Sequence, residues 1–367
     1  MEDVIYLASC AVKGEAPDKT RVAGMDLGRL YSAADRHLLT GVTAYALESA
    51  GVFDPAFTQA KAKAIRKIVL FDSERAVVLR ELDKAGIWHM PLKGAVLKDY
   101  YPAIGMRQMA DNDILFDAAR ADDVKTIMEG LGFSTVYFDT SNHDVYHKAP
   151  VSSFEMHRSL FGPSHDEKLY EYYRNAEERL LGDGYEKHLG PEDFYIYVTA
   201  HEYMHYSISG TGLRSVLDTY VYLQKVKLDM GYVTTEAEKL GMAEFEAANR
   251  SLAQHLFSGE SLTEADREML EYILSSGVYG TRTNLVQNRL STFGHGKIHY
   301  MLKRFAEPLD RKSRNYQTLS KEFPFFYKHR ALLPCLTVYR VFLRLKEGKL
   351  KAELEALKKA KEKLGKR

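Results

Sequence analysis

The spacing of hydrophobic positions changes twice along the chain. Over residues 1–87 apolar residues recur every three or four positions, as in YSAADRHLLTGVTAYALESAG and FTQAKAKAIRKIVLFDSERAVVLRELDKAG. This spacing places apolar side chains on one helix face, and Gly51 and Gly86 are typical of helix ends. We therefore predict an N-terminal region of helices.

Residues 88–160 show the short, alternating pattern that is typical of strands. The segments IWHMPLK, DNDILF, FSTVYFD, DVYHKAP and SSFEMHRSL each predict a strand, whereas AVLKDYY and AARADDVKTIMEGLG predict helices between them. Together these elements predict a compact α/β unit around a small mixed β-sheet.

From Pro191 onward the pattern is helical again, in amphipathic pieces separated by glycines. These glycines are Gly210, Gly212, Gly231, Gly277 and Gly294. We therefore predict an α+β fold with three parts: N-terminal helices (1–87), an α/β core with the small mixed sheet (88–190) and a larger C-terminal helical region (191–367).

Composition narrows the class of protein. Of the 367 residues, 45% are hydrophobic and 28% are charged, which is typical of a folded soluble chain. Lys and Arg number 51 against 50 Asp and Glu, so the net charge of +1 does not favour a long nucleic acid as partner. The start, MEDVIYLASCAVKGEAP, is unlike a signal peptide, and no apolar run is long enough for a membrane span. We expect a cytoplasmic protein.

Two further features concern the ends of the chain. Cys10 and Cys335 predict a reducing compartment without a disulfide framework, although one bridge between them would fit the sequence. The last segment, KEGKLKAELEALKKAKEKLGKR, is a Lys/Glu helix with leucines near one face: Leu350, Leu354, Leu357 and Leu364. It is either a packed terminal helix or a helix that contacts a partner or a membrane surface.

Two aspartates open the predicted strand DNDILF. Side chains alternate along a strand, so Asp111 and Asp113 point to the same side, roughly 6.5–7 Å apart along the backbone. Such a pair can hold one or two Mg²⁺ ions, which prefer oxygen ligands and share them with substrate phosphates. A D-x-D also occurs as two exposed or capping aspartates, so the surrounding residues matter.

The surrounding residues suit a nucleotide. Lys93 and Gly94 stand where a predicted strand gives way to a helix, where backbone N–H groups can hold a phosphate beside an ammonium. Arg107, just upstream of the aspartates, could reach the same triphosphate. Downstream, Glu155 and His157 share one face of the strand SSFEMHRSL. Three carboxylates on neighbouring strands that face a glycine turn predict a catalytic metal site.

The order L-K-G, then R-x-x-x-D-x-D, then E-x-H resembles the nucleotidyltransferase superfamily with the DNA polymerase β-type fold. More closely, it resembles the bacterial branch of uncharacterised nucleotidyltransferases. The segments PEDFYIYVTAHEYMHYSISGTGLRSVLDTYVYLQK and FPFFYKHRALLPCLTVYR extend the resemblance over most of the chain. One departure is Asn112, where relatives usually carry an apolar residue, and we expect it to weaken the packing of the strand.

The resemblance implies a reaction and roles for individual residues. An NMP group would move from an NTP, such as ATP, to an acceptor with release of pyrophosphate, and Mg²⁺ or Mn²⁺ would be the cofactor. Asp111 and Asp113 would bind metal, and Glu155 would be a further metal ligand or the base that activates the acceptor hydroxyl. Lys93 and Gly94 would form the phosphate-binding turn, without the hydroxyl of the Gly-Ser of many relatives. The remaining predicted nucleotide contacts are Arg107, His157, His205, Arg214 and Asp218.

The segment HEYMH, residues 201–205, matches the zinc motif H-E-x-x-H. On a helix, His201 and His205 would share one face, with Glu202 as general base of a zinc hydrolase. No recognisable third ligand follows, and histidines on a half-buried helix are commonly hydrogen-bonded as neutral rings. We therefore predict no zinc at this segment.

The next predicted helix, GLRSVLD, indicates that HEYMH lies at the substrate cleft. Arg214 and Asp218 stand at i, i+4 and can pair on the helix surface. We expect His201, His205 and Arg214 to face the substrate cleft, with Asp218 as a hydrogen-bond partner for a histidine.

Three functions compete. The first is nucleotidyl transfer to a sugar, an antibiotic, a protein side chain or a nucleic-acid end. The second is a non-catalytic protein that retains the fold and binds a nucleotide or a partner. The third is the zinc hydrolase.

Overall fold

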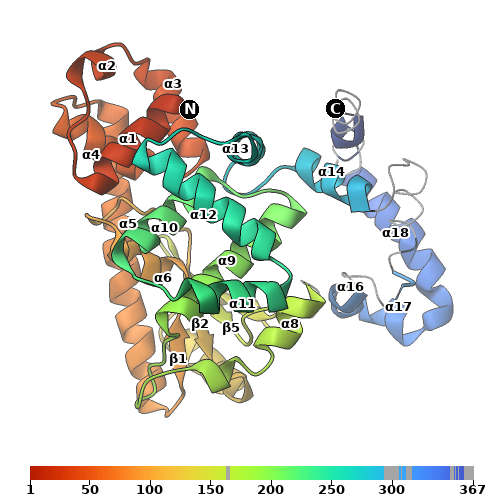
Figure 1. Ribbon diagram of the computed structural model, residues 1–367. Coiled ribbons are helices and arrows are strands. Elements are labelled where there is room, and N and C mark those ends of the chain that lie inside the picture. Colours follow the sequence, from red (N-terminus) through yellow and green to blue (C-terminus); the bar gives the residue numbers. More distant parts are fainter. Residues whose placement is uncertain are drawn as a thin grey trace.

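One small sheet lies within a body of helices (Figure 1). The computed structural model describes residues 1–162, 166–292, 306, 308–310, 316–347, 351, 353 and 355–358. Along the chain, helices both precede and follow the strands of this one mixed sheet, so the α+β prediction is confirmed.

The N-terminal region is helical, as predicted. Its helices are α1 (Glu2–Lys13), α2 (Lys19–Ala23), α3 (Leu27–Arg36), α4 (Thr40–Ser49) and α5 (Pro55–Lys84). The longest, α5, begins where the Asp54 side chain accepts hydrogen bonds from the N–H groups of Ala56 and Phe57. The helices α4 and α5 end just before Gly51 and Gly86, both of which have positive φ.

The sheet has five strands in the order β1-β2-β5-β4-β3. Their bounds are β1 (His89–Pro91), β2 (Asn112–Phe116), β3 (Ser134–Tyr137), β4 (His143–Lys148) and β5 (Ser152–His157). The β2–β5 pair is parallel and the other three pairs are antiparallel, so the sheet is mixed, as predicted. The short α6 (Gly94–Leu97) follows β1, and α7 (Ala121–Gly130) follows β2.

The two faces of the sheet have different chemistry. One face is apolar: Ile114 and Phe116 of β2 and Phe154 and Met156 of β5 pack against α5 and α7 in a buried cluster. Because side chains alternate along a strand, the odd-numbered positions of β2 and β5 point to the opposite face. That face carries the predicted acids and lies toward the C-terminal helices.

Asn112 strengthens the attachment of β2 instead of weakening it. Its amide is fully buried, donates a hydrogen bond to the Phe71 carbonyl of α5 (3.3 Å) and accepts one from Arg75 (2.9 Å). The expectation of weaker packing was therefore wrong, because a buried amide with partners at both ends is stabilised.

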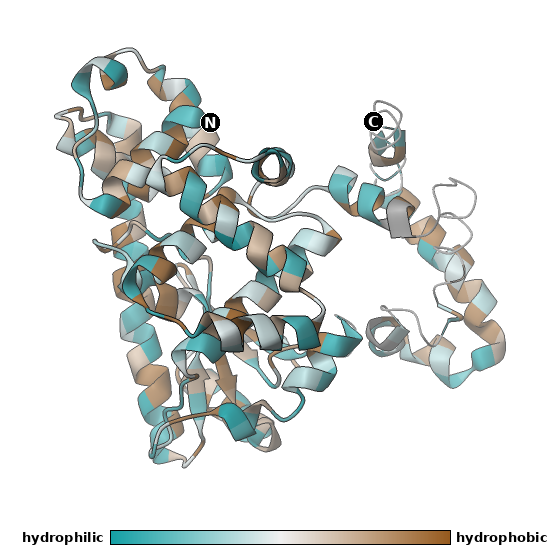
Figure 2. Cartoon of the chain, viewed as in Figure 1, coloured by the Kyte–Doolittle hydropathy of each residue, from teal (hydrophilic) through white to brown (hydrophobic). Residues whose placement is uncertain are grey.

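The C-terminal part is helical, as predicted. Its helices are α8 (Glu167–Tyr173), α9 (Pro191–Ile208), α10 (Leu213–Lys225), α11 (Met230–Leu240), α12 (Ala243–Ser258), α13 (Glu264–Ser276), α14 (Arg282–Thr292), α16 (Tyr316–Glu322), α17 (Pro324–Lys328) and α18 (Leu333–Lys346). Figure 2 shows hydrophobic and hydrophilic positions on each long helix, as amphipathic helices require.

The largest hydrophobic cluster connects the N-terminal helices with helices that follow the sheet. It contains Leu7 and Leu47 from the first helices together with Leu217 of α10, Leu252 of α12 and Ile273 of α13. The N-terminal helices are thus packed against helices that follow the sheet. The division into parts at residues 87 and 190 stays a prediction.

The described C-terminal residues include a small buried cluster in which Leu357 and Ala356 pack with Val286 and Leu290 of α14. This agrees with the packed-helix interpretation of the tail at these positions. The other leucines of the tail, Leu350, Leu354 and Leu364, lie outside the described residues, as does Gly294.

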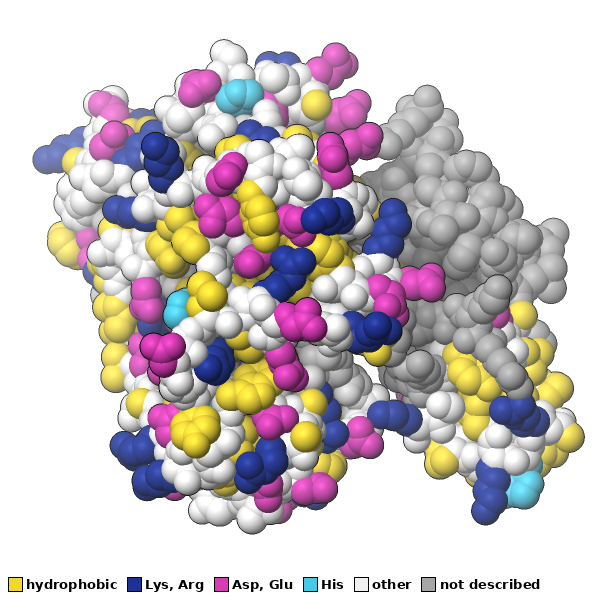
Figure 3. Space-filling model, turned by 60° about the horizontal axis from the view of Figure 1, so that its bottom comes forward, with side chains coloured by type: hydrophobic (Ala, Val, Ile, Leu, Met, Phe, Trp, Pro, Cys, Tyr) yellow, Lys and Arg dark blue, Asp and Glu magenta, His cyan; other side chains and the backbone are white. Residues whose placement is uncertain are grey.

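Three further observations concern the surface and the cysteines. Cys10 and Cys335 are both free thiols. In Figure 3, Lys/Arg and Asp/Glu side chains are interspersed over the visible face, which agrees with the net charge of +1. None of the helices in the described ranges is both long and apolar enough to cross a bilayer.

Candidate active site

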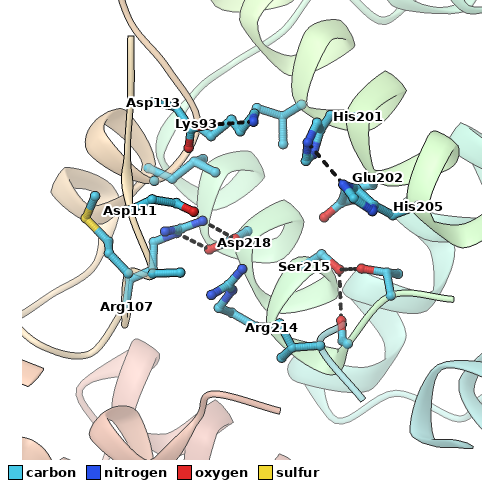
Figure 4. Close-up of a pocket in the computed structure, with 18 of the residues that line it drawn as sticks. Lys93, Arg107, Asp111, Asp113, His201, Glu202, His205, Arg214, Ser215 and Asp218 are labelled. Carbon is cyan, nitrogen blue, oxygen red and sulfur yellow. Dashed lines mark hydrogen bonds and ion pairs between the residues drawn. The ribbon is translucent and has the colours of Figure 1, made fainter. Parts of the chain in front are cut away.

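A cavity of about 310 Å³ lies between the acid-bearing face of the sheet and the helices α9 and α10 (Figure 4). Its polar lining comes from two regions of the chain. The sheet region contributes Lys93, Arg107, Asp111, Asp113 and Glu155, and α9, α10 and the loop between them contribute His201, Glu202, His205, Thr211, Arg214, Ser215 and Asp218. Tyr279, which follows α13, also lines it and is 77% exposed.

The three predicted acids meet at this cavity. Asp113 and Glu155 are direct neighbours on the parallel strands β2 and β5. Asp111 precedes β2 by one residue and lines the same cavity. The predicted strand alternation explains why both aspartates face the same space.

Their proximity changes their ionisation. Burial, together with the charge of Asp113, raises the pKa of both Asp111 and Glu155 to about 7. Burial also opposes ionisation of Asp113, but the Lys93 ammonium and a hydrogen bond from His157 hold the pKa of this carboxyl well below its usual range. Asp113 is therefore firmly ionised, and burial together with its charge keeps Asp111 and Glu155 from ionising until near neutral pH.

Lys93 lies among these acids. Its Nζ donates a hydrogen bond to Asp113 Oδ1 at 2.7 Å, and the side chain is only 16% exposed. Burial disfavours the ammonium, but the Asp113 carboxylate outweighs it and raises the pKa of Lys93. The Lys93 backbone has φ 44° and ψ −114°, a conformation that glycine adopts more readily. The strand-to-helix turn thus holds a cation directly over the carboxylates.

Gly94 allows the closest approach in this turn. A Cβ at this position would lie 2.5 Å from Arg107 Nη1 and 3.4 Å from Met109 Cγ. The Arg107 guanidinium cannot easily retreat, because Asp218 binds it from the other side. A residue without a side chain is therefore required here.

Asp218 binds Arg107 and not Arg214. Arg107 donates from Nε to Asp218 Oδ1 and from Nη2 to Oδ2, both at 2.9 Å, and Tyr101 donates to Oδ1 at 2.7 Å. Among the described salt bridges Asp218 pairs with Arg107 alone, so the predicted i, i+4 pair with Arg214 was wrong. The reason is that the loop after α6 folds back onto α10 and uses both carboxylate oxygens.

Arg214 faces the cavity from α10. Its Nη1 donates to the Gln108 carbonyl at 3.2 Å, and its buried Nε has no hydrogen-bond partner. Gln108 is held in turn by Thr40, whose hydroxyl lies 2.9 Å from the Gln108 Oε1, and by the Gly41 N–H at 3.1 Å. The N-terminal helices therefore position the loop that carries Arg107 and Asp111.

HEYMH lies on α9, as predicted, and the described residues contain no third His, Cys, Asp or Glu ligand close to both His201 and His205. The His201 and His205 Nε2 atoms lie 3.2 Å apart, so the histidines contact each other, and the suggested partner Asp218 is occupied by Arg107. Glu202 is buried and accepts a hydrogen bond from Asn249 at 3.1 Å. Burial, with the charge of Asp218, raises the pKa of Glu202 to about 8.

One predicted nucleotide contact lies elsewhere. His157 is buried beside Asp113, with Nε2 2.9 Å from Oδ1, and it is absent from the described cavity lining.

His143 on β4, which is a neighbour of His157, was not identified from the sequence. The signal was the alternation in HDVYHK, which places His143 on the same face as Glu155 once β4 and β5 are known to pair.

The family of the chain follows from a comparison with family models. Residues 23–258 match the family described as "Uncharacterised nucleotidyltransferase", which is well over half of the chain. The chain belongs to this nucleotidyltransferase family. The comparisons with curated proteins and with solved structures found no match.

Proposed function

We propose that this protein transfers an NMP group from an NTP to an acceptor hydroxyl or phosphate, with release of pyrophosphate. The observation that carries the proposal is the convergence of Asp111, Asp113 and Glu155 in a cavity that also receives Lys93 and Arg214. Carboxylates suit metal ions, and the cations opposite suit phosphates.

The donor set fits Mg²⁺ or Mn²⁺. Three carboxylates line one cavity, and burial together with the charge of Asp113 raises the pKa of Asp111 and Glu155, an effect that a bound cation would oppose. All three offer oxygen, the ligand atom that these hard cations prefer. When bound, the metal would neutralise charge that develops on the phosphates during transfer.

The side chains of the chain itself would bind and orient the substrate. Arg214 lines the cavity and has a buried Nε without a hydrogen-bond partner. When metal neutralises the acids, the Lys93 ammonium could leave Asp113 and bind a phosphate oxygen. Arg107 is committed to Asp218, so we assign it to positioning the helix α10 and not to phosphate binding.

In the proposed reaction, one bond to the α-phosphorus forms and one breaks. The acceptor oxygen forms a bond to the α-phosphorus, and the bond from that phosphorus to the bridging oxygen of the β-phosphate breaks, which releases pyrophosphate. Glu155, with a pKa of about 7, would either accept the hydroxyl proton or bind metal. His201 and His205 on α9 would line the space for the nucleoside or the acceptor.

Binding of the four NTPs to the full chain, with and without Mg²⁺, tests the proposal. We expect one NTP to bind in a Mg²⁺-dependent manner and Asp111→Ala to abolish that dependence. Asp122→Ala, which removes an exposed aspartate from α7, is the matched control and should behave as wild type. NTP binding that is identical with and without metal, in wild type and Asp111→Ala alike, would contradict the proposal.

A second measurement separates transfer from binding alone. Incubation with α-labelled NTPs and cell extract should label an acceptor and release pyrophosphate in wild type but not in Asp111→Ala. Tight Mg²⁺-dependent binding without pyrophosphate release would favour a nucleotide-binding protein that retains the fold.

A further inference from the structure

Glu155 has a second set of neighbours, on the strand β4. In the antiparallel β4–β5 pair, His143 lies directly opposite His157, and Val145 lies opposite Glu155. Directly opposed residues have Cβ atoms about 4.5–5.5 Å apart, and diagonal neighbours remain within reach of long side chains. Two imidazoles therefore flank one carboxylate on the same face of the sheet.

We propose that His143, Glu155 and His157 form a binding site for Zn²⁺ or a similar first-row transition-metal ion. The site lies beside the cavity: Glu155 belongs to the cavity lining, whereas neither histidine is among the described lining residues. The two proposed metal sites share Glu155 but differ in their other ligands, which are His143 and His157 here and Asp111 and Asp113 in the oxygen site.

The distances between the two histidines and Glu155 are close to those of a metal site. Glu155 Oε2 lies 3.8 Å from His143 Nε2 and 3.7 Å from His157 Nε2, and one ligand atom from each of the three residues lies within 4.8 Å of the others. Bonds of about 2.0–2.2 Å in a tetrahedral site separate the ligand atoms by roughly 3.3–3.6 Å. The two distances from the histidines to Glu155 exceed this separation by only a few tenths of an ångström.

A neighbouring amide prepares His143 as a ligand. His143 Nδ1 lies 3.3 Å from the Asn142 side-chain oxygen, which can only accept a hydrogen bond. This contact assigns the ring proton to Nδ1 and leaves a lone pair on Nε2, the atom that faces Glu155. Metal-binding histidines commonly donate their second ring N–H to a carbonyl or carboxylate in this way.

The ligand types select the metal. Two imidazoles with one carboxylate, plus water, form a donor set typical of zinc and of other late divalent ions, whereas Mg²⁺ prefers oxygen. Coordination through His157 Nε2 would exchange its hydrogen bond to Asp113 for a metal bond. The ion would thus release Asp113 Oδ1 from one of its two present donors, Lys93 and His157.

Zinc binding to the metal-depleted full chain tests the proposal, and Mg²⁺ is left out because it would compete for Glu155. We expect one Zn²⁺ per chain, at least about 100-fold weaker binding in His143→Ala, and about 10–100-fold weaker binding in the positioning variant Asn142→Ala. The matched control is His147→Ala, which removes an exposed histidine from the same strand and should bind zinc as wild type.

Three readouts distinguish this site from the alternatives. X-ray absorption at the zinc edge should show two imidazole ligands, and the melting temperature of His143→Ala without metal should match that of wild type. Asp111→Ala should keep the zinc site even if it abolishes Mg²⁺-dependent NTP binding, so the two proposals can fail separately. Absence of stoichiometric zinc in wild type, or zinc that His201→Ala removes and His143→Ala retains, would overturn the proposal.

Discussion

Arg107 and Asp218 form a buried ion pair with two parallel hydrogen bonds of 2.9 Å across the wall of the cavity. The two residues are 111 positions apart, one in the loop before β2 and the other on α10. A buried pair of this kind is weak evidence for net stability, because both charges lose hydration. It fixes the acid-bearing sheet relative to the helices that complete the cavity.

Breaking this pair from one side should destabilise the protein strongly. We expect Asp218→Asn to lower the free energy of unfolding by about 3–5 kcal/mol, because Arg107 would remain buried with its charge uncompensated. Asp35→Asn makes the same chemical change at an exposed position of α3 and should stay within about 0.5 kcal/mol of wild type. Urea denaturation of both variants checks this, and equal midpoints would contradict the role of Asp218.

Gly94 offers a test of the close approach at the Lys93 turn. Gly94→Ala should lower the free energy of unfolding by about 1–3 kcal/mol, because the new methyl group would displace Arg107 from its place beside Asp218. Gly130→Ala at the end of α7, where a Cβ meets nothing within 4 Å, should be neutral or slightly stabilising. Thermal unfolding of the two alanine variants would reveal the difference, and the reverse order would rule out steric contact as the reason for glycine at position 94.

The raised pKa values of Asp111 and Glu155 predict how metal binding responds to pH. Both values, about 7, exceed those of the unfolded chain, about 3.9 and 4.3. The folded protein therefore retains protons that the unfolded chain releases, and these two groups destabilise the metal-free protein as the pH rises from about 4 to 7.

Metal competes with those protons, so Mg²⁺ should stabilise the protein more at pH 8 than at pH 6. The measurement is the rise in melting temperature on adding Mg²⁺ at each pH. Asp111→Asn removes one competing proton site and should flatten the dependence. A Mg²⁺ effect that is equal at both pH values, or larger at pH 6, would be inconsistent with binding to these acids.

Glu202 should make the stability of the metal-free protein depend on pH. Its pKa of about 8 lies above the unfolded value of about 4.3, so its contribution to stability falls as the pH rises between these values. Glu202→Gln keeps an acceptor for Asn249 and removes the ionisation. The melting temperature of the variant, relative to wild type, should rise from pH 5 to pH 8 and then level off. A constant difference over that range would mean that Glu202 is already ionised in the fold.

Strand periodicity explains what the sequence could predict at the site. Alternation in DNDILF and SSFEMHRSL places Asp111, Asp113 and Glu155 on matching faces, because that property is local to each strand. The parallel pairing of β2 with β5 then makes Asp113 and Glu155 neighbours. The residues of the acid cluster were therefore accessible from the pattern alone.

Other features of the site depend on contacts between distant residues, which the sequence pattern could not predict. The i, i+4 rule pairs Arg214 with Asp218, but it carries no information on a loop that folds back from the other side of the cavity. The same holds for His143, because the strand order that brings β4 beside β5 is absent from any local pattern. The burial of Lys93 also depends on that distant packing.

The shared core of the first helices and α10, α12 and α13 has a consequence for biosynthesis. When α1 to α4 leave the ribosome, the partners of Leu7 and Leu47 on the later helices have not yet been translated. At about 5–20 residues per second, some 160 residues separate α4 from the start of α10, a delay of roughly 10–30 s. The nascent chain exposes this apolar surface to solvent for that time. We therefore expect chaperones at the exit of the ribosomal tunnel to bind its first helices.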